Sequence, residues 1–251
     1  MPGLRIAYLG HAAPSVPQVM RTFGPDMRVR VLPLLLTAAY HSKTDLPRVL
    51  ARTGVRVAYG NPLGPHPLLL RALERRLPET ALQNPAETGV ILAAAGSSDP
   101  EANATIARLA ARWQAAAGWF AVRPAYASAT GPTPAQAVTE LRIAGARRVV
   151  VASYLLAPGL FADRIRDASL AAGAAAVSPA LLAGPPAAAG LAGPPAAAGL
   201  AGPPAATGLP GPPAATGLAW PPAAAGGAAT EVADVVLDRY AEAGTRERAA
   251  A

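Results

Sequence analysis

The sequence predicts an α/β protein of two duplicated domains, each a parallel sheet flanked by helices, with a disordered insert rich in proline, alanine and glycine. Three observations predict this architecture. Short β-branched runs alternate with amphipathic segments, as in a parallel sheet covered by helices. Two long stretches of the chain resemble each other, which indicates a duplicated unit. Residues 182–226 repeat with a period of nine residues, unlike the rest of the chain.

The apolar patterns assign the elements in order. Runs rich in valine, leucine and isoleucine are expected to form strands, and segments with helical spacing of apolar residues are expected to form helices. The expected strands are Arg5–Leu9, Arg28–Leu36, Val55–Tyr59, Val90–Ala94, Ala121–Ala125 and Arg147–Tyr154. The expected helices are Val16–Phe23, Lys43–Arg52, Pro67–Leu77, Glu101–Ala117, Thr133–Ala144, Phe161–Ala171 and Glu231–Ala243.

The duplication sets the domain boundaries. "AYLGHAAPSVPQVM" at 7–20 matches "AYASATGPTPAQAV" at 125–138 without gaps, at an offset of 118 residues. We therefore expect an N-terminal half at 1–80 and a C-terminal half at 88–181 plus 227–245. The second copy opens with a strand and a helix at 89–114, whose counterpart in the first copy falls before Met1. The first strand–helix unit of the N-terminal half is therefore expected to be missing, because the start codon is misplaced, because the sequence is a fragment, or because the unit has been lost.

Residues 182–226 consist of five nonapeptides such as "LAGPPAAAG". Two adjacent prolines in each unit exclude a continuous helix or a central strand. One leucine in nine residues cannot bury enough apolar area to offset the entropy lost on ordering. The segment is predicted to be a disordered or polyproline-like insert. A proline-rich docking segment is the alternative, but no charged residue flanks the prolines to support it.

Composition limits the function classes. The 251 residues include no cysteine, so disulfides and thiolate metal sites are excluded. We expect a soluble, cytoplasmic protein with no membrane partner, because the longest apolar stretch is shorter than the ~18 residues of a membrane span. The net charge of +7 comes almost entirely from arginine, and Lys43 is the sole lysine. This charge fits either a scattered solvated surface or attraction of a ligand with many carboxylates.

Two ligand classes are not expected. Basic runs with interleaved aromatic residues are absent from the sequence, so no nucleic-acid partner is predicted. The phosphate-binding glycine motifs of nucleotide and dinucleotide sites are also absent, so no nucleotide cofactor is predicted. The sequence gives no signal for the oligomeric state.

Three histidines are the candidates for metal or proton chemistry. His41, in "AYHSKTDLP", follows the carboxyl end of an expected strand, where α/β sheets gather ligands. A neutral imidazole there can bind a divalent transition metal or accept a proton; the alternative is a surface histidine that caps the next helix. His11 also follows a strand and is a second candidate metal ligand, or a plain loop residue. His66, between two prolines at a helix start, is expected to be structural.

The turn "AGSSDPEAN" at 95–103 is a candidate anion site. Asp99 and Pro100 are typical of a helix N-terminus, as capping residue and first helical residue. Exposed amides and hydroxyls at such a terminus also bind anions. Ser97 and Ser98 are therefore candidate substrate-binding residues, and capping and anion binding are compatible.

The chain resembles the sirohydrochlorin chelatases of the small, cofactor-free type, also called the cobalt chelatase family, in its duplicated two-domain form. The resemblance rests on "VLPLLLTAAYHSKTDLP", "NPLGPHPLL", "AAAGSSDPEAN", "PAYASATGPTPAQAV" and "VVVASYLLAPGLFADRI". It covers residues 5–180 and, less closely, 229–245. The "YH…DLP" loop is its most specific element.

The resemblance implies insertion of cobalt or ferrous iron into sirohydrochlorin, in cobalamin or sirohaem biosynthesis. The divalent metal and the tetrapyrrole are then substrates, and His41 matches a metal-binding and catalytic histidine of the family. The first histidine of such enzymes lies in the strand–helix unit that is expected to be missing here. The alternatives are a non-catalytic protein that binds metal or tetrapyrrole and a truncated, inactive homologue.

Replacing residues 182–226 with a flexible Gly/Ser linker should leave the fold intact, because the repeat is expected to contribute no core contacts. A linker of about fifteen residues spans roughly 20 Å. The Tm should change by less than about 4 °C, which corresponds to about 1 kcal/mol or slightly more for a chain of this size. A larger fall in a calorimetric scan would show that the repeat belongs to the folded core.

Overall fold

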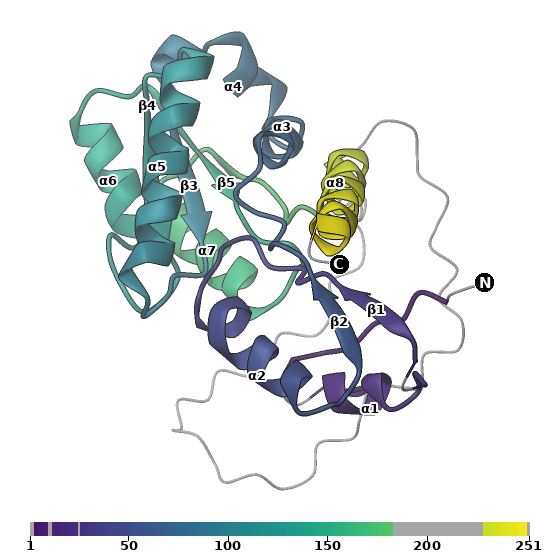
Figure 1. The fold of residues 1–251 in the computed structure, drawn as a ribbon. Helices are drawn as coiled ribbons and strands as arrows, with labels where there is room; N and C mark the ends of the chain where they lie inside the picture. The colour runs from purple at the N-terminus through teal and green to yellow at the C-terminus, as the bar shows by residue number, and fades with distance from the viewer. Residues whose placement is uncertain (1–2, 10–11, 25, 183–227, 250–251) are drawn as a thin grey trace, which may run out of the picture.

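The computed structural model describes residues 3–9, 12–24, 26–182 and 228–249 (Figure 1). In chain order the elements of the first part are α1 (Val16–Met20), β1 (Arg28–Val31), the π-helix η1 (His41–Asp45), α2 (Leu46–Ala51), β2 (Arg56–Tyr59), α3 (Pro67–Glu74), α4 (Glu79–Gln83) and η2 (Pro85–Glu87). The second part contains β3 (Thr88–Ala94), α5 (Pro100–Ala117), β4 (Ala121–Tyr126), α6 (Pro134–Ile143), β5 (Arg148–Ser153), α7 (Leu160–Ala171), β6 (Ala176–Val177) and α8 (Ala228–Ala249).

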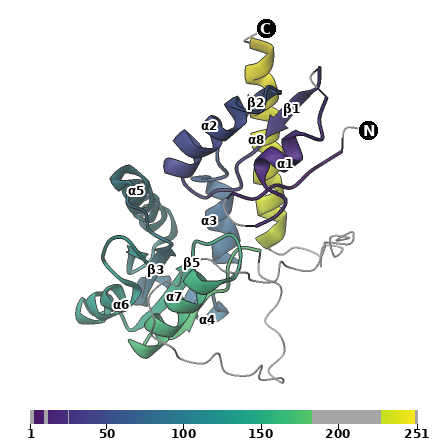
Figure 2. The same cartoon turned by 90° about the horizontal axis from the view of Figure 1, so that it is seen from below.

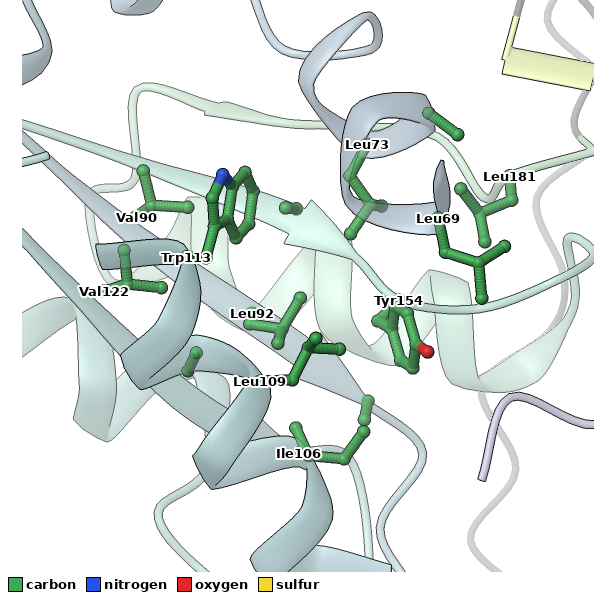
Figure 3. Packing of buried hydrophobic residues seen from close by; sticks show 14 of the residues in the cluster. Leu69, Leu73, Val90, Leu92, Ile106, Leu109, Trp113, Val122, Tyr154 and Leu181 are labelled. Carbon is green, nitrogen blue, oxygen red and sulfur yellow. The ribbon is translucent and has the colours of Figure 1, made fainter. Parts of the chain in front are cut away.

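The second half contains a four-stranded parallel sheet in the order β4-β3-β5-β6. Strand β3 is fully buried at the centre, because helices cover both faces of the sheet. Helices α3 and α5 pack on one face, where Leu69, Leu92 and Trp113 share a buried cluster (Figure 3). Helices α6 and α7 cover the other face around Ile91 and Ile165. The α/β prediction is therefore confirmed.

The first half contains a smaller parallel sheet, β1-β2. Valines of β1 and β2 face α1 and α2 in a small apolar cluster that includes Met20, Leu46 and Leu50. Helix α8 contacts the same two strands, and the guanidinium of Arg30 in β1 lies 4.7 Å from the ring centroid of Tyr240 in α8. Figures 1 and 2 show α8 running beside α3 and along this sheet. The last helix of the chain thus connects both halves.

The predicted duplication is visible in backbone detail. The amide of Tyr8 donates to the carbonyl of Pro14, and the amide of Tyr126 donates to the carbonyl of Pro132, both at 2.9 Å. The two pairs lie 118 residues apart, the offset that the sequence predicts. Both turns lead into a helix with a capping box, formed by Ser15 in the first half and by Thr133 in the second.

The predicted strand Arg5–Leu9 is wrong: residues 3–9 form an isolated bridge between Tyr8 and Ser15, and Leu4 and Ile6 are 90% and 61% exposed. The duplication explains the difference. This segment corresponds to β4, which pairs only with the central strand β3. The described part of the first half contains no strand at the position of β3, so the segment lacks the neighbour that its counterpart uses.

Other boundaries shift by a few residues. Strand β1 ends at Val31 rather than Leu36, because Pro33 cannot donate to a ladder. The helix expected to begin at Lys43 begins at His41 with one π-helical turn. The short elements α4, η2 and β6 were not predicted. The predicted insert at 182–226 lies, apart from Leu182, outside the described residues. Its first residue corrects the prediction: Leu182 packs against the main apolar cluster, and its amide donates to the carbonyl of Leu156 at 2.8 Å, so the folded part extends to Leu182.

The two halves meet where the chain enters α3. The hydroxyl of Tyr154, in the second half, donates to the carbonyl of Leu36, in the first half, at 3.2 Å. Gly64 lies against both groups, and a Cβ at Gly64 would collide with the Leu36 carbonyl oxygen and the Tyr154 hydroxyl. Among the helices within the described ranges, none is long and apolar enough to cross a membrane.

Gly64→Ala should destabilise the protein, because its methyl group would force Leu36 and Tyr154 apart. Such overpacking costs roughly 1–3 kcal/mol, and each kcal/mol corresponds to about 2–4 °C of Tm for a chain of this size. Gly24→Ala is the matched control, since a Cβ at Gly24 meets nothing within 4 Å. Equal Tm values for the two variants would contradict close packing of Gly64 against Leu36 and Tyr154.

Candidate functional site

The π-helical turn η1 holds His41 at the end of the loop that follows β1. Its anchor is Ser42, which is buried and whose hydroxyl donates to the carbonyl of Ala39 at 3.0 Å. The hydroxyl of Tyr59, at the end of β2, donates to the Ser42 carbonyl at 2.8 Å. Burial raises the pKa of Tyr59 to about 12, so this hydroxyl keeps its proton at neutral pH. The sheet therefore fixes the backbone on which His41 is mounted.

The imidazole of His41 lies on the outer side of this turn, with its side chain 66% exposed. Its Nδ1 atom is 3.2 Å from Oδ2 of Asp45, one turn later. The ring of Tyr40 meets the imidazole edge-on, at a centroid distance of 6.0 Å. The described residues contain no group of three or more His, Asp or Glu side chains placed to hold a metal ion together. The site thus offers one imidazole backed by one carboxylate.

Lys43 brings η1 against the second half. Its Nζ lies 3.4 Å from Oδ2 of Asp99, which caps the start of α5. The loops after β1 and after β3 both leave the carboxyl ends of parallel strands, and this ion pair joins them. Ligand sites in α/β proteins form at such ends. The structure therefore brings the turn that carries His41 and the predicted turn at 95–103 to the same junction, through Lys43 rather than through the imidazole itself.

The turn itself is held by its own polar groups. The amide of Ser97 donates to Oδ1 of Asn103 at 3.0 Å, and its hydroxyl oxygen accepts from the amide of Asp99 at 3.0 Å. Oδ1 of Asp99 accepts from the amide of Glu101 at 3.0 Å. That amide, and to a lesser extent the ammonium of Lys43, hold the pKa of Asp99 below its usual range. An internal carboxylate therefore already occupies the N-terminus of α5.

The two predicted substrate-binding serines are in different environments. Ser97 is partly buried and its polar groups stabilise the turn, whereas Ser98 is exposed. Anion binding at this turn stays a prediction, and Ser98 is the residue of the pair whose side chain faces solvent. A sequence pattern of two serines before a helix could not separate these two roles.

The remaining histidines divide as follows. His66 caps α3, because its Nδ1 accepts from the amide of Leu68 at 3.3 Å. Burial, and then the nearby guanidinium of Arg239, lower the pKa of His66, which fits the expected structural role. His11, the second predicted metal ligand, lies outside the described residues. The sequence reasoning missed the contact between His41 and Asp45, although their spacing of four residues on a helix was a usable signal.

Comparisons with known proteins agree on one family. The sequence model of the CbiX family matches residues 1–80 and 89–182. The chain is 31% identical over 147 residues to the sirohydrochlorin cobaltochelatase of Priestia megaterium, covering 55% of this chain and 48% of that protein. It is 25% identical over 174 residues to the sirohydrochlorin ferrochelatase of the same organism, covering 66% and 65%. The chain thus spans between about half and two thirds of these relatives.

A solved structure has a similar fold. SirB from Bacillus subtilis with Fe³⁺ superposes with a TM-score of 0.57 and 25% sequence identity, covering 69% of this chain and 73% of that chain. The sirohydrochlorin chelatase SirB of Bacillus subtilis subspecies spizizenii, in complex with cobalt, gives a TM-score of 0.56 at 22% identity. The second likeness concerns the fold alone.

The free energy of unfolding below about pH 4 should depend on whether the Asp99 carboxylate is ionised. Because its pKa in the folded protein lies below the ordinary value of 3.8, the unfolded chain binds the proton more tightly. The carboxylate therefore stabilises the fold above about pH 4, and this contribution is lost as pH falls through the folded pKa. Asp99→Ala should be less stable than the parent at pH 7, and the difference should shrink in acid denaturation series.

Asp99→Asn is the matched control, because its side-chain oxygen still caps the helix but carries no charge. It should retain more stability than Asp99→Ala at pH 7, and it should lose less stability than the parent as the pH falls, because neither variant titrates at this position. A stability gap between parent and Asp99→Ala that stays constant from pH 7 into strong acid would contradict the depressed pKa.

Proposed function

This chain belongs to the CbiX family, and we propose that it inserts a divalent metal ion, cobalt or ferrous iron, into sirohydrochlorin. The product would serve cobalamin or sirohaem biosynthesis. The relatives named for this chemistry support the reaction class. The observation that carries the proposal is His41, an exposed imidazole on a rigid turn at the junction of the two halves.

The chemistry needs a donor that holds the ion and then releases it. A neutral imidazole nitrogen is a suitable ligand for both cobalt and ferrous iron. A single imidazole binds more weakly than the four nitrogens of the macrocycle, so transfer to the ring is downhill. After transfer, the same nitrogen can accept one of the two protons that leave the ring, and solvent accepts the other. His41 is therefore assigned both the metal-binding and the proton-accepting role.

Charge supports capture of the tetrapyrrole. The protein carries a net charge of +7, and sirohydrochlorin carries many carboxylates. Opposite net charges accelerate encounter, and salt screens the effect over about 10 Å at 0.1 M. At the junction, Lys43 is half exposed beside the turn that contains Ser98. We assign the exposed Ser98 to a substrate carboxylate, because the amides of Ser97, Asp99 and Glu101 are already bonded within the turn.

Purified protein should accelerate cobalt insertion into sirohydrochlorin, followed as an absorbance change. His41→Ala should remove the acceleration, because His41 is the one described histidine on the turn at this junction. His66→Asn is the matched control: asparagine can still cap α3, so the rate should stay near that of the parent. An unchanged rate in His41→Ala would refute the assigned role. Binding of sirohydrochlorin without acceleration by the parent would support the non-catalytic alternative.

A further inference from the structure

The contacts of the two described histidines favour ring protons on opposite nitrogens. In His41, Nδ1 faces Oδ2 of Asp45 at 3.2 Å, and an ionised carboxylate only accepts hydrogen bonds. Nδ1 must therefore carry the proton. A neutral imidazole has one N–H, so the lone pair of His41 is on Nε2. Within the described ranges, Nε2 of His41 has no hydrogen-bond partner.

His66 shows the reverse arrangement. Its Nδ1 accepts from the amide of Leu68 at 3.3 Å, so the proton is on Nε2, which lies 3.7 Å from Oδ2 of Asp238. The lone pair of His66 thus accepts the hydrogen bond that caps α3 and is not available to a metal ion. Of the described histidines, His41 is the one whose lone pair points to solvent.

The turn that carries His41 and Asp45 is rigid on its inner side. The amide of Leu46 donates to the carbonyl of His41 in the five-residue spacing of a π-helix. The buried Ser42 ties the same turn to Tyr59. His41 and Asp45 project from it, with side chains 66% and 40% exposed. The backbone therefore fixes the pair, while the side chains remain accessible.

From this geometry we propose that Asp45 is the positioning residue of His41: its carboxylate holds the imidazole as the Nδ1–H tautomer and so presents Nε2 as the metal-donating atom. The proposal rests on the proposed function for the identity of the ligand. A carboxylate behind a metal-binding histidine fixes the tautomer and ring orientation and raises the basicity of the donor nitrogen. Without it, the ring is free to rotate and to hold its proton on Nε2, which moves the lone pair to Nδ1 and leaves Nε2 unable to bind the ion.

A pair of side chains four residues apart can also serve only to stabilise an exposed helix. The test must therefore measure the tautomer itself. Long-range ¹H–¹⁵N spectra of the imidazoles, recorded without metal at about pH 8, roughly 1.5 units above the ordinary histidine pKa, distinguish the two tautomers. His41→Gln assigns the resonances of His41.

The parent should show the Nδ1–H pattern for His41 and the Nε2–H pattern for His66. Asp45→Ala should move His41 toward the Nε2–H pattern, and Asp45→Asn should keep most of the Nδ1–H pattern, because its amide oxygen still accepts. The pattern of His66 should be the same in all three proteins, which makes it an internal reference. A His41 pattern unaffected by Asp45→Ala would overturn the proposal.

The second measurement is the affinity for Co²⁺ alone, by calorimetric titration. Asp45→Ala should weaken binding roughly 10–100-fold, the usual effect of removing a partner behind a metal ligand, and Asp45→Asn should weaken it less. Asp167→Ala, which removes an exposed carboxylate on α7, is the control and should bind like the parent.

His41→Ala separates the two claims. If it abolishes Co²⁺ binding at this site while Asp45→Ala binds like the parent, His41 is the donor and the positioning role of Asp45 is refuted. If His41→Ala binds Co²⁺ like the parent, the proposed function of His41 fails. In that case the tautomer spectra still report whether Asp45 sets the imidazole proton.

Discussion

The packing of α3 against the sheet of the second half fixes where the first half lies, and therefore where His41 lies. Leu69 and Leu73 of α3 are fully buried in the large apolar cluster around β3 and β5. Helix α8 packs on the other side of α3 and reaches β1 and β2. Helix α3 thus covers the sheet of the second half, and α8 contacts both α3 and the sheet of the first half. These buried contacts hold the two strand ends together and so allow the Lys43–Asp99 pair to form.

Periodicity predicted the second half closely, because its strands are buried on both faces and read as continuous apolar runs. The first half was predicted less well for one physical reason. Residues 5–9 have the composition of a strand, but a strand needs a neighbour, and pairing is not a local property of the sequence. The internal repeat explains the difference, because residues 5–9 correspond to β4, and β4 pairs only with β3.

The candidate site shows the same division between local and long-range information. The position of His41 after a strand end was readable from the sequence, as was the capping role of Asp99. The contact of Lys43 with Asp99 joins residues 56 positions apart and required the fold. The use of Ser97 inside the turn also became visible only with its partner Asn103 in place. The carboxylate of Asp45, by contrast, was within reach of sequence reasoning.

In this site the fold holds the turn rigid, and the exposed ring nitrogen Nε2 of His41 is the atom proposed to bind the metal ion. Nε2 of His41 is assigned as the atom that holds the incoming ion, and anomalous diffraction from crystals grown with Co²⁺ locates that ion. A cobalt peak is expected at an ordinary metal–imidazole bond length from Nε2 of His41, roughly 2.0–2.1 Å as for zinc. A fully occupied cobalt site elsewhere in the protein, with none at His41, would contradict this assignment.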